Sequence, residues 1–497
     1  MPGHDRRDSE ARCPFVIDLR PVILVIGVFL AILGVSMLAP TFVDFALGNP
    51  DWPVFLGAAA VGITIGLGLW ASARGVTSQL SARQAILMTV GTWLSLAALG
   101  ALPFYWSGVT PSYADAFFES MSGITTTGAT VISGLDNLPT GILFWRAILQ
   151  WLGGLGIIVM AVAVLPMLQI GGMQLFKTEA FDTADKILPR AAQISGSLTL
   201  VYAVLTATCA LLYAVLGMDV ADAVMHAMTT VATGGFSTKD DSLGHFKSAE
   251  IELTAILFMV LGSLPYIYFV QALRGQPAAL LRDTQVRAFL KFLFVFTILI
   301  WAYKDLTGLE PGLNGMRHAA FNITSIMTGT GYATTDYEAW GLFASAVFFI
   351  VMFIGGCSGS TSCGIKIFRF QVLFQEMRQQ SARLIFPNGI FIKQFNGRPI
   401  GEDVSSAVMS FFFLYLVSFI VLSIALSLTG LDPLTAFSGA ATAISNVGPG
   451  LGPIIGPAGN FEPLSDTAKW LLSAGMILGR LELFTVLVLV LPAFWRG

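Results

Sequence analysis

Apolar runs recur along this chain, each long enough to cross a hydrocarbon layer. A membrane-spanning helix needs roughly 20 predominantly apolar residues, and the runs leave little room for a soluble domain. Of the 497 residues, 55% are hydrophobic and 11% are charged, whereas soluble domains carry about 25% charged residues. The chain is therefore predicted to be an all-α membrane protein with ten spans, at residues 22–47, 52–72, 84–106, 142–170, 194–216, 251–273, 288–303, 340–374 (interrupted), 404–428 and 467–491.

The distribution of basic residues predicts the orientation of these spans. Ten crossings place both termini on one side, which carries 20 of the 27 Lys and Arg residues; the other side carries six, and Arg480 lies inside a span. Loops rich in Lys and Arg stay in the cytoplasm, so both termini are predicted to be cytoplasmic. The first apolar run is too long for the core of a signal peptide, and no small-residue cleavage site follows it.

Four polar, glycine-containing stretches interrupt the apolar pattern between spans. They are MSGITTTGATV (121–131), MTTVATGGFST (228–238), TSIMTGTGYATT (324–335) and ATAISNVGPGLG (441–452). A segment of about a dozen residues precedes each, opened by a residue of a type that caps helices. The caps are Ser112, Asp219, Asn314 and Asp432, which lie 16, 15, 17 and 16 residues before Gly128, Gly234, Gly331 and Gly448.

The matched spacing predicts an internal repeat. The short helices cannot span a bilayer, and non-helical backbone at membrane depth must be buried in protein or line a cavity. The predicted fold is four parallel helix–pore loop–helix repeats around a central pore, plus an extra N-terminal helix pair. The predicted parts are a cytoplasmic tail 1–20, the helix pair 21–73, repeats 84–171, 194–274 and 287–377 (the last with a broken second helix), a cytoplasmic segment 378–402, and repeat 403–497.

The composition of the four loops favours a cation filter. Short-helix C-termini carry about half a negative charge, and glycine permits backbone angles that let carbonyl oxygens replace an ion's hydration shell. Small-residue helix contacts are the alternative, but they require no common distance from a capping residue. The predicted filter residues are Thr126, Thr127, Gly128, Ala232, Thr233, Gly234, Thr330, Gly331, Asn446, Val447 and Gly448.

A second polar stretch breaks the eighth span. Residues 355–364 comprise four glycines, four hydroxyl residues and two cysteines, a composition that ends a helix. It is interpreted as an obstruction inward of the filter that can move; a loop at the end of an ordinary helix is the alternative. A phosphate-binding P-loop is excluded because Ile365 and Lys366 follow the last glycine. The predicted gate residues are Gly355, Gly356, Cys357, Ser358, Gly359, Ser360, Gly364 and Arg480.

Arg480 is the one basic residue in the middle of a span. A cation there costs about 2.5–3.5 kcal/mol on insertion scales, so something must compensate. One interpretation places it in a water-filled pore below the filter, as an electrostatic barrier to cations. The alternative is an ion pair with an acid on another span, since Glu482 lies off the same helix face.

These residues resemble the Trk/Ktr/HKT superfamily of potassium transporters, and the ten-span plan resembles its bacterial TrkH-type branch. The resemblance is strongest at the four loops and at GGCSGSTSCGIKIFR (355–369) and GRLELFT (479–485). It implies one filter glycine per repeat, at Gly128, Gly234, Gly331 and Gly448, in the potassium-selective pattern. It also implies that 355–364 is the gating loop, with Cys363 where glycine is expected, and that Arg480 lines the pore.

The resemblance further implies the transported ion, the cellular location and the partners of such a protein. Potassium is the transported ion, with no organic cofactor in this chain, across the bacterial inner membrane. The implied partners are membrane lipid, a second copy of the chain, and cytosolic TrkA-like regulatory subunits that bind NAD(H) and/or ATP and dock near 366–398; nucleic acid is not expected.

The predicted function is gated, channel-like potassium uptake. A potassium symporter coupled to sodium or protons on the same fold is the alternative. An intramembrane enzyme using Cys357, Ser358 or Ser360 as nucleophile is disfavoured because no histidine lies near that loop in sequence. The four cysteines indicate neither disulfides nor a metal site, and no role is assigned to His226, His318, Glu119 or Arg146.

Overall fold

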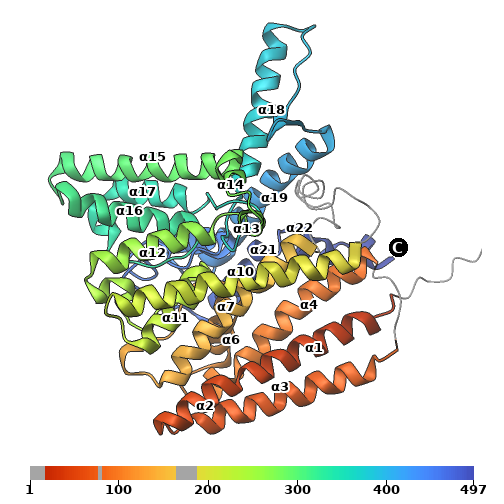
Figure 1. Cartoon of the computed structure of the whole chain (residues 1–497), viewed down its shortest axis with the longest axis vertical. Helices are drawn as coiled ribbons and strands as arrows, with labels where there is room; N and C mark the ends of the chain where they lie inside the picture. Colours follow the sequence, from red (N-terminus) through yellow and green to blue (C-terminus); the bar gives the residue numbers. More distant parts are fainter. Residues whose placement is uncertain (1–16, 76–80, 164–186, 497) are drawn as a thin grey trace, which may run out of the picture.

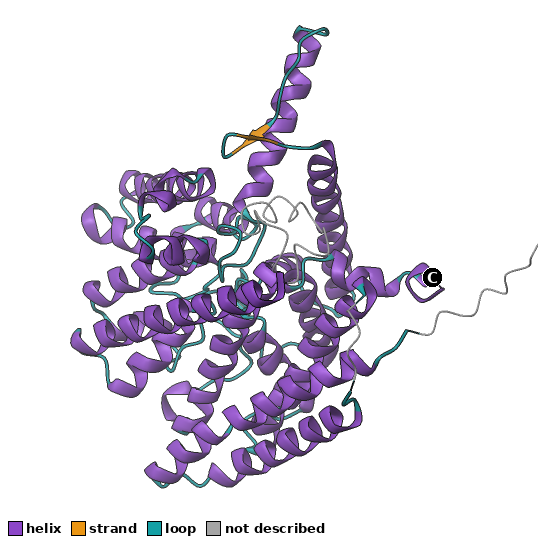
Figure 2. Cartoon of the chain, turned by 45° about the vertical axis from the view of Figure 1, so that its right-hand side comes forward, coloured by secondary structure: helices purple, strands orange, loops and turns teal. Residues whose placement is uncertain are grey.

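The computed structural model describes residues 17–75, 81–163 and 187–496 of the chain, and these are mostly helical (Figures 1 and 2). Most of the predicted tail 1–20 and the end of the first repeat, 164–171, lie outside the described residues. So do His4, Cys13 and five of the basic residues counted on the side of the termini, namely Arg6, Arg7, Arg12, Lys177 and Lys186.

Seven helical segments in the described chain are long and apolar enough to cross a membrane. They begin where the sequence provides start signals, such as Pro21 and Pro53 in the first turns of α1 and α3 and a capping box between Ser81 and Gln84 at α4. The segments are α1 (Arg20–Ser36) with α2 (Leu38–Leu47), α3 (Trp52–Ser72), α4 (Ala82–Gly100) with α5 (Leu102–Trp106), α7 (Thr140–Ala163), α10 (Ile187–Val215), α15 (Thr284–Thr307) and α19 (Glu402–Ser427).

The remaining predicted spans are broken. The pair α12 (Ala249–Gly262) and α13 (Tyr266–Leu273) bends by 93°, and α21 (Asp466–Arg480) bends by 113° into α22 (Phe484–Leu487) and η5 (Val488–Val490). The interrupted eighth span is α17 (Leu342–Val351), too short to cross alone, and then a loop. These three account for the remaining predicted crossings.

Four short helices precede the polar loops, as predicted: α6 (Tyr113–Ile124), α11 (Val220–Val231), α16 (Gly312–Thr328) and α20 (Pro433–Ser445). Ser112, Asp219 and Asp432 accept main-chain N–H bonds at the helix starts and are confirmed as caps. The prediction for Asn314 is wrong. Pro311 holds the chain extended, so α16 begins directly after it and Asn314 falls in the first turn.

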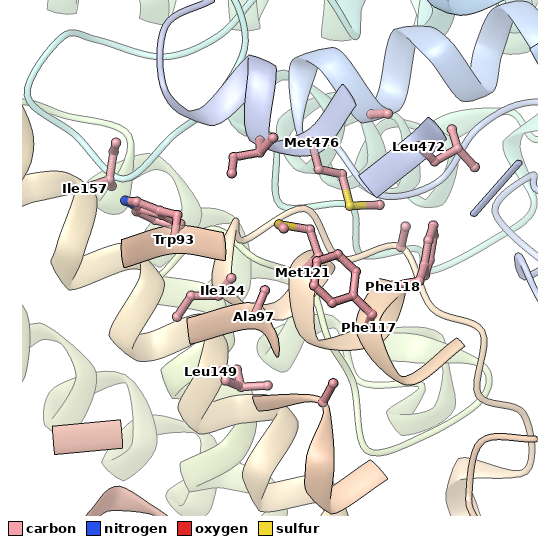
Figure 3. Close-up of a cluster of buried hydrophobic side chains, with 14 of the residues drawn as sticks. Trp93, Ala97, Phe117, Phe118, Met121, Ile124, Leu149, Ile157, Leu472 and Met476 are labelled. Atoms are coloured by element: carbon pink, nitrogen blue, oxygen red, sulfur yellow. The ribbon is translucent and has the colours of Figure 1, made fainter. Parts of the chain in front are cut away.

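The repeats are arranged in a ring. Helix α11 contacts α7, α16 contacts α12, and α21 contacts α6, which links repeat 1 to 2, 2 to 3, and 4 back to 1. Between repeats 4 and 1, Met476 and Leu472 of α21 pack against Met121 and Phe117 of α6 (Figure 3). Because lipid is as apolar as these side chains, close packing rather than the hydrophobic effect stabilises such contacts. The N-terminal pair α1–α3 lies outside the ring against α4 (Figure 1).

Helix α18 (Ile367–Ile385) projects away from the bundle (Figures 1 and 2). The predicted inner half of the eighth span, 365–374, forms the first turns of α18, which is amphipathic and continues to Ile385, beyond the predicted end. A hairpin of β1 (Gln394–Phe395) and β2 (Arg398–Pro399) returns beside it. We call residues 367–399, which comprise α18 and the hairpin, the α18 arm. Lys393 holds the arm together and to α19, because its Nζ lies 2.8 Å from Glu376 and 2.9 Å from Glu402. The arm overlaps the predicted cytoplasmic segment 378–402.

Candidate functional site

The four polar loops have one backbone conformation. In each, the residue that ends the helix or the one after it adopts left-handed angles, and two residues later a glycine has a positive φ. The left-handed residues are Thr126 (φ 51°), Thr233 (50°), Gly329 (74°) and Asn446 (53°). The glycines are Gly128 (φ 87°), Gly235 (76°), Gly331 (83°) and Gly448 (108°).

These four glycines pack into a closed ring. A methyl group added to any of them would meet a main-chain carbonyl oxygen of the next repeat, so only glycine fits without displacing backbone. Each such oxygen belongs to the residue directly before that repeat's own glycine. The pairs are Gly128 with Gly234, Gly235 with Thr330, Gly331 with Val447, and Gly448 with Thr127.

The structure shifts the predicted register of the second repeat by one residue. Gly235, not Gly234, takes the position equivalent to Gly128, while Gly234 corresponds to Thr127. Ala232 corresponds to Thr125, because both end their short helices. With Gly235 the distance from the cap Asp219 becomes 16 residues. Two consecutive glycines hid this register from sequence reasoning.

One pocket is lined by the whole ring. Gly128, Gly235, Gly331 and Gly448 all line it, together with polar groups that include Arg146 and Asp240. The pocket joins all four repeats, so the ring faces a shared vestibule. This is the convergence that the matched spacing predicted.

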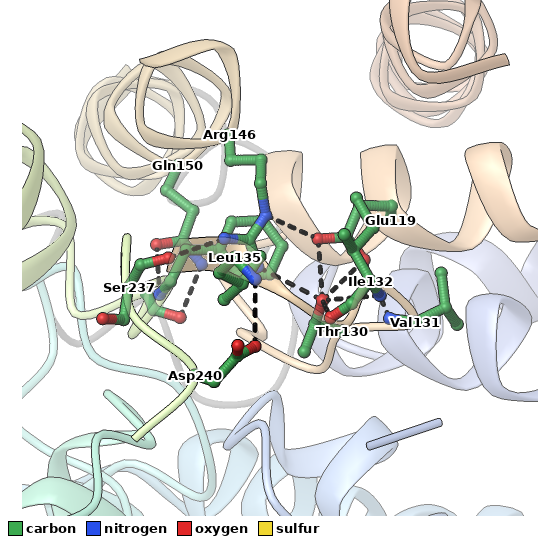
Figure 4. Close-up of polar contacts among 11 residues, drawn as sticks. Glu119, Thr130, Val131, Ile132, Leu135, Arg146, Gln150, Ser237 and Asp240 are labelled. Carbon is green, nitrogen blue, oxygen red and sulfur yellow. Dashed lines mark hydrogen bonds and ion pairs between the residues drawn. The ribbon is translucent and has the colours of Figure 1, made fainter. Parts of the chain in front are cut away.

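Two residues without a predicted role, Glu119 and Arg146, connect the first two loops (Figure 4). Arg146 of α7 forms a buried ion pair with Glu119 of α6, at 2.8 Å between Nε and Oε1. The Arg146 guanidinium also donates to the Ser237 main-chain oxygen at 2.7 Å and to Thr130 Oγ1 at 3.2 Å. Because buried charges persist only when paired and hydrogen-bonded, the network fixes loops 1 and 2 relative to each other.

Gln150 makes a second brace one turn further along α7. Its Nε2 donates to the Gly234 oxygen at 2.6 Å, and its Oε1 accepts from the Phe236 main-chain N–H at 3.0 Å. A buried amide bonded on both sides holds the second loop. Its signal in the sequence was a Gln in an apolar span, four residues after Arg146.

A loop from the third repeat, residues 352–366, lies on the side of the ring opposite to the pocket that the four glycines line. Thr233 Oγ1 is 3.2 Å from Thr361 Oγ1, and Thr126 Oγ1 is 3.6 Å from Cys363 Sγ. A methyl group on Gly329 would lie 3.3 Å from the Cys363 Cβ. The loop therefore touches the left-handed residues of three repeats.

The break between α12 and α13 anchors this loop. Main-chain bonds join Thr361 N–H to the Gly262 oxygen at 3.1 Å and Cys357 N–H to the Ser263 oxygen at 3.0 Å. The two ends of the loop meet in a bridge between Ile354 and Ile365. The bend between α12 and α13 in the second repeat thus holds the loop 352–366 of the third repeat in place.

Arg480 ends α21 beneath the ring and is buried. Its guanidinium donates to the Thr361 oxygen at 3.2 Å and the Gly153 oxygen at 3.4 Å, and lies 2.6 Å from Cys363 Sγ. Within the described residues no carboxylate pairs with it. Glu482 pairs instead with Arg369 of α18.

The predicted gate residues divide into two groups. Ser358, Gly359, Ser360, Gly364 and Arg480 line one pocket beneath the ring, which Asn446 also lines. Gly355, Gly356 and Cys357 belong to the anchored part of the loop: their N–H groups donate to the Ile365 main-chain oxygen, the Ser362 hydroxyl and the Ser263 main-chain oxygen, respectively. Thr361 and Cys363, which contact both Arg480 and the ring, were missing from the predicted set.

Comparisons with known proteins identify relatives over nearly the whole chain. A family described as "TrkH: Cation transport protein" matches residues 52–496. The Trk system potassium uptake protein TrkI of Halomonas elongata is 42% identical, covering 96% of this chain and 97% of its own. TrkH of Escherichia coli K12 is 37% identical, covering 96% and 99%. The crystal structure of the potassium transporter TrkH from Vibrio parahaemolyticus matches with a TM-score of 0.90 at 36% identity, covering 97% of this chain and 100% of that one.

Proposed function

This chain belongs to the TrkH family of cation transport proteins, and from that premise we propose that it conducts potassium into the cell through the ring of four loops. The observation that carries the proposal is the four-fold recurrence of one loop conformation around a shared pocket. Four unrelated contacts would not need the same pair of positive-φ residues.

The chemistry of the ring suits a large monovalent cation. Its glycines are packed against main-chain carbonyl oxygens, and such oxygens can replace water around an ion that is cheap to dehydrate. The short helices α6, α11, α16 and α20 end at the ring, so their C-terminal dipoles favour positive charge there. We assign the ring positions to Gly128, Gly235, Gly331 and Gly448.

The loop 352–366 and Arg480 serve as the gate. The loop lies directly inward of the ring, and the guanidinium of Arg480 meets it at Thr361 and Cys363. A fixed positive charge on the ion path opposes a passing cation. Opening therefore requires the loop and Arg480 to separate or withdraw together.

The arm of α18 and the hairpin is the proposed docking element for a cytosolic regulatory subunit. It continues directly from the gate loop, because α18 begins at Ile367, the residue after Lys366 at the end of that loop. The relatives are named as parts of a "Trk system". A subunit of the TrkA type, binding NAD(H) and/or ATP, would pull on the gate loop through this helix, in a homodimeric pore protein.

Rubidium flux into liposomes holding purified protein tests the proposal. Wild-type protein should admit rubidium in the presence of excess sodium, and Gly331→Val should abolish the flux while the protein still elutes as a single species. Unitary currents would identify a channel, whereas a fixed ratio of potassium to sodium or protons would identify a symporter. Flux and selectivity that survive the substitution would refute the filter.

A further inference from the structure

A basic cavity of about 560 Å³ lies away from the ion path, near the base of the α18 arm. It is bounded by the α13–α14 turn, the start of α15 and the tip of the β1–β2 hairpin, with α14 spanning Ala278–Arg282. Figure 1 shows α14 close to the start of α15 and the base of α18. None of the residues so far assigned to the ring or the gate lines it.

Three arginines line this cavity: Arg282, Arg287 and Arg398. In the described chain none of them forms an ion pair. Arg287 Nη2 donates to the main-chain oxygen of Arg282 at 3.3 Å, which leaves its other donors available. Unpaired guanidinium groups gathered around one hollow are suited to a phosphate, whose oxygens they bind in a bidentate manner.

The one acid in the cavity wall is already engaged. Asp283 Oδ1 accepts the main-chain N–H groups of Gln285 and Val286, at 2.8 and 3.0 Å. Its Oδ2 accepts from Tyr268 Oη at 2.7 Å and from Asn396 Nδ2 at 2.8 Å. The carboxylate thus joins the start of α15, Tyr268 and the hairpin through hydrogen bonds, and in the described chain it forms no ion pair with the three arginines.

The tip of the hairpin is hydrogen-bonded to Asp283 and to its neighbour Thr284. Asn396 Oδ1 accepts from both the main-chain N–H and the hydroxyl of Thr284, at 2.8 and 2.7 Å. Asn396 and Gly397 adopt positive φ angles, as a tight two-residue turn requires. Arg398 therefore lies at the cavity next to a turn that is held by hydrogen bonds.

The position of the cavity favours a lipid source for the phosphate. Thr284 begins the membrane-spanning α15, so the cavity lies at the depth of headgroups. Beside it Leu273 and Leu281 are 78% and 66% exposed, as expected of side chains that contact acyl chains. Basic pockets at the ends of spans are places where anionic headgroups bind. We propose that this cavity binds the phosphate headgroup of an anionic membrane lipid.

Native mass spectrometry of the full chain, delipidated and titrated with phosphatidylglycerol or phosphatidylcholine, tests the proposal. Wild-type protein should retain the anionic lipid preferentially. The triple substitution Arg282→Gln, Arg287→Gln and Arg398→Gln should weaken its binding by about tenfold or more. The matched control Arg20→Gln, Arg74→Gln and Lys247→Gln removes equal charge from exposed positions outside the cavity and the α18 arm, and should leave binding unchanged.

Three further measurements make the result decisive. Lysine at the same three positions should keep most of the binding, which separates lost charge from lost folding. Millimolar inorganic phosphate should not displace the lipid; displacement would overturn the lipid source. The proposal also fails if both glutamine triples weaken binding equally, or if the cavity triple keeps the lipid and instead loses a cytosolic protein partner.

Discussion

Gly234 and Gly235 are adjacent, but a side chain would meet different neighbours at the two positions. At Gly235, φ is +76° and a methyl group would collide with the Thr330 carbonyl oxygen, which is backbone of the next repeat. At Gly234 the methyl group would meet the amide of Gln150, a side chain that can rotate. Left-handed angles cost a non-glycine residue roughly 1–2 kcal/mol in addition to any collision.

We therefore predict unequal effects for the two alanine substitutions. Gly235→Ala should lower rubidium flux by about tenfold or more, since 1.4 kcal/mol already changes an equilibrium constant tenfold. Gly234→Ala should keep most of it. Uptake into liposomes in the presence of sodium, normalised to reconstituted protein, measures both. If Gly234→Ala lost more rubidium flux than Gly235→Ala, the ring position of the second repeat would have to be assigned to Gly234.

Arg480 has a buried charge whose described partners are neutral groups. Two unit charges about 4 Å apart interact by about 4 kcal/mol at an effective dielectric constant of 20, so its removal should ease cation passage. We expect Arg480→Ala to raise basal rubidium flux, by about tenfold or more, without a regulatory subunit present. Arg480→Lys, which keeps the charge, should raise it less. Flux that merely follows protein abundance would assign Arg480 a structural role.

At the scale of elements, the sequence predicted most helices because apolar length and capping residues are local signals. The four short helices and three of their caps follow from such signals. The resemblance to the family is confirmed by the matched relatives. Contacts between segments far apart in sequence left no local signal: Cys363 with Arg480 and Thr126, and Glu119 with Arg146. The choice between two adjacent glycines depended on such contacts as well.

The α18 arm should loosen in acid. A hydrogen bond from Lys393 lowers the pKa of Glu376 below its ordinary value. A carboxylate with a lowered pKa stabilises the fold above its unfolded pKa of about 4.3, and this contribution is lost as the pH falls through the folded value. The protection factors of backbone amides in residues 376–405, which compare each exchange rate with its intrinsic value at the same pH, should therefore fall below about pH 4. Glu376→Gln should show the faster exchange already at neutral pH, and an unchanged profile in that variant would refute the role of the pair.

At the scale of the whole molecule, the ring depends on helices that break. α12–α13 and α21–α22 bend sharply and α17 ends early, and each break supplies a group to the space below the ring: Gly262 and Ser263, Arg480, or the loop 352–366. Polar backbone freed in this way must be satisfied within the protein, and here the breaks satisfy one another. The unbroken N-terminal pair α1–α3 has no such part in the site.

The two ends of α15 allow the orientation of the whole molecule to be tested. Basic residues are concentrated on the side of the termini, and moving them across the bilayer is disfavoured, so the arm should be cytoplasmic and the far end of α15 outside. Leu306, near the end of α15, and Leu384, near the end of α18, are 87% and 85% exposed. Because Gln371 of α18 donates to the oxygen of Thr284 at the start of α15, we expect the two leucines on opposite sides of the membrane. Cys209, Cys357 and Cys363 are buried, so a Cys13→Ser background should be nearly unreactive. In intact cells a membrane-impermeant maleimide should label Leu306→Cys, and Leu384→Cys only after permeabilisation; the reverse pattern would invert the direction assigned to the pore.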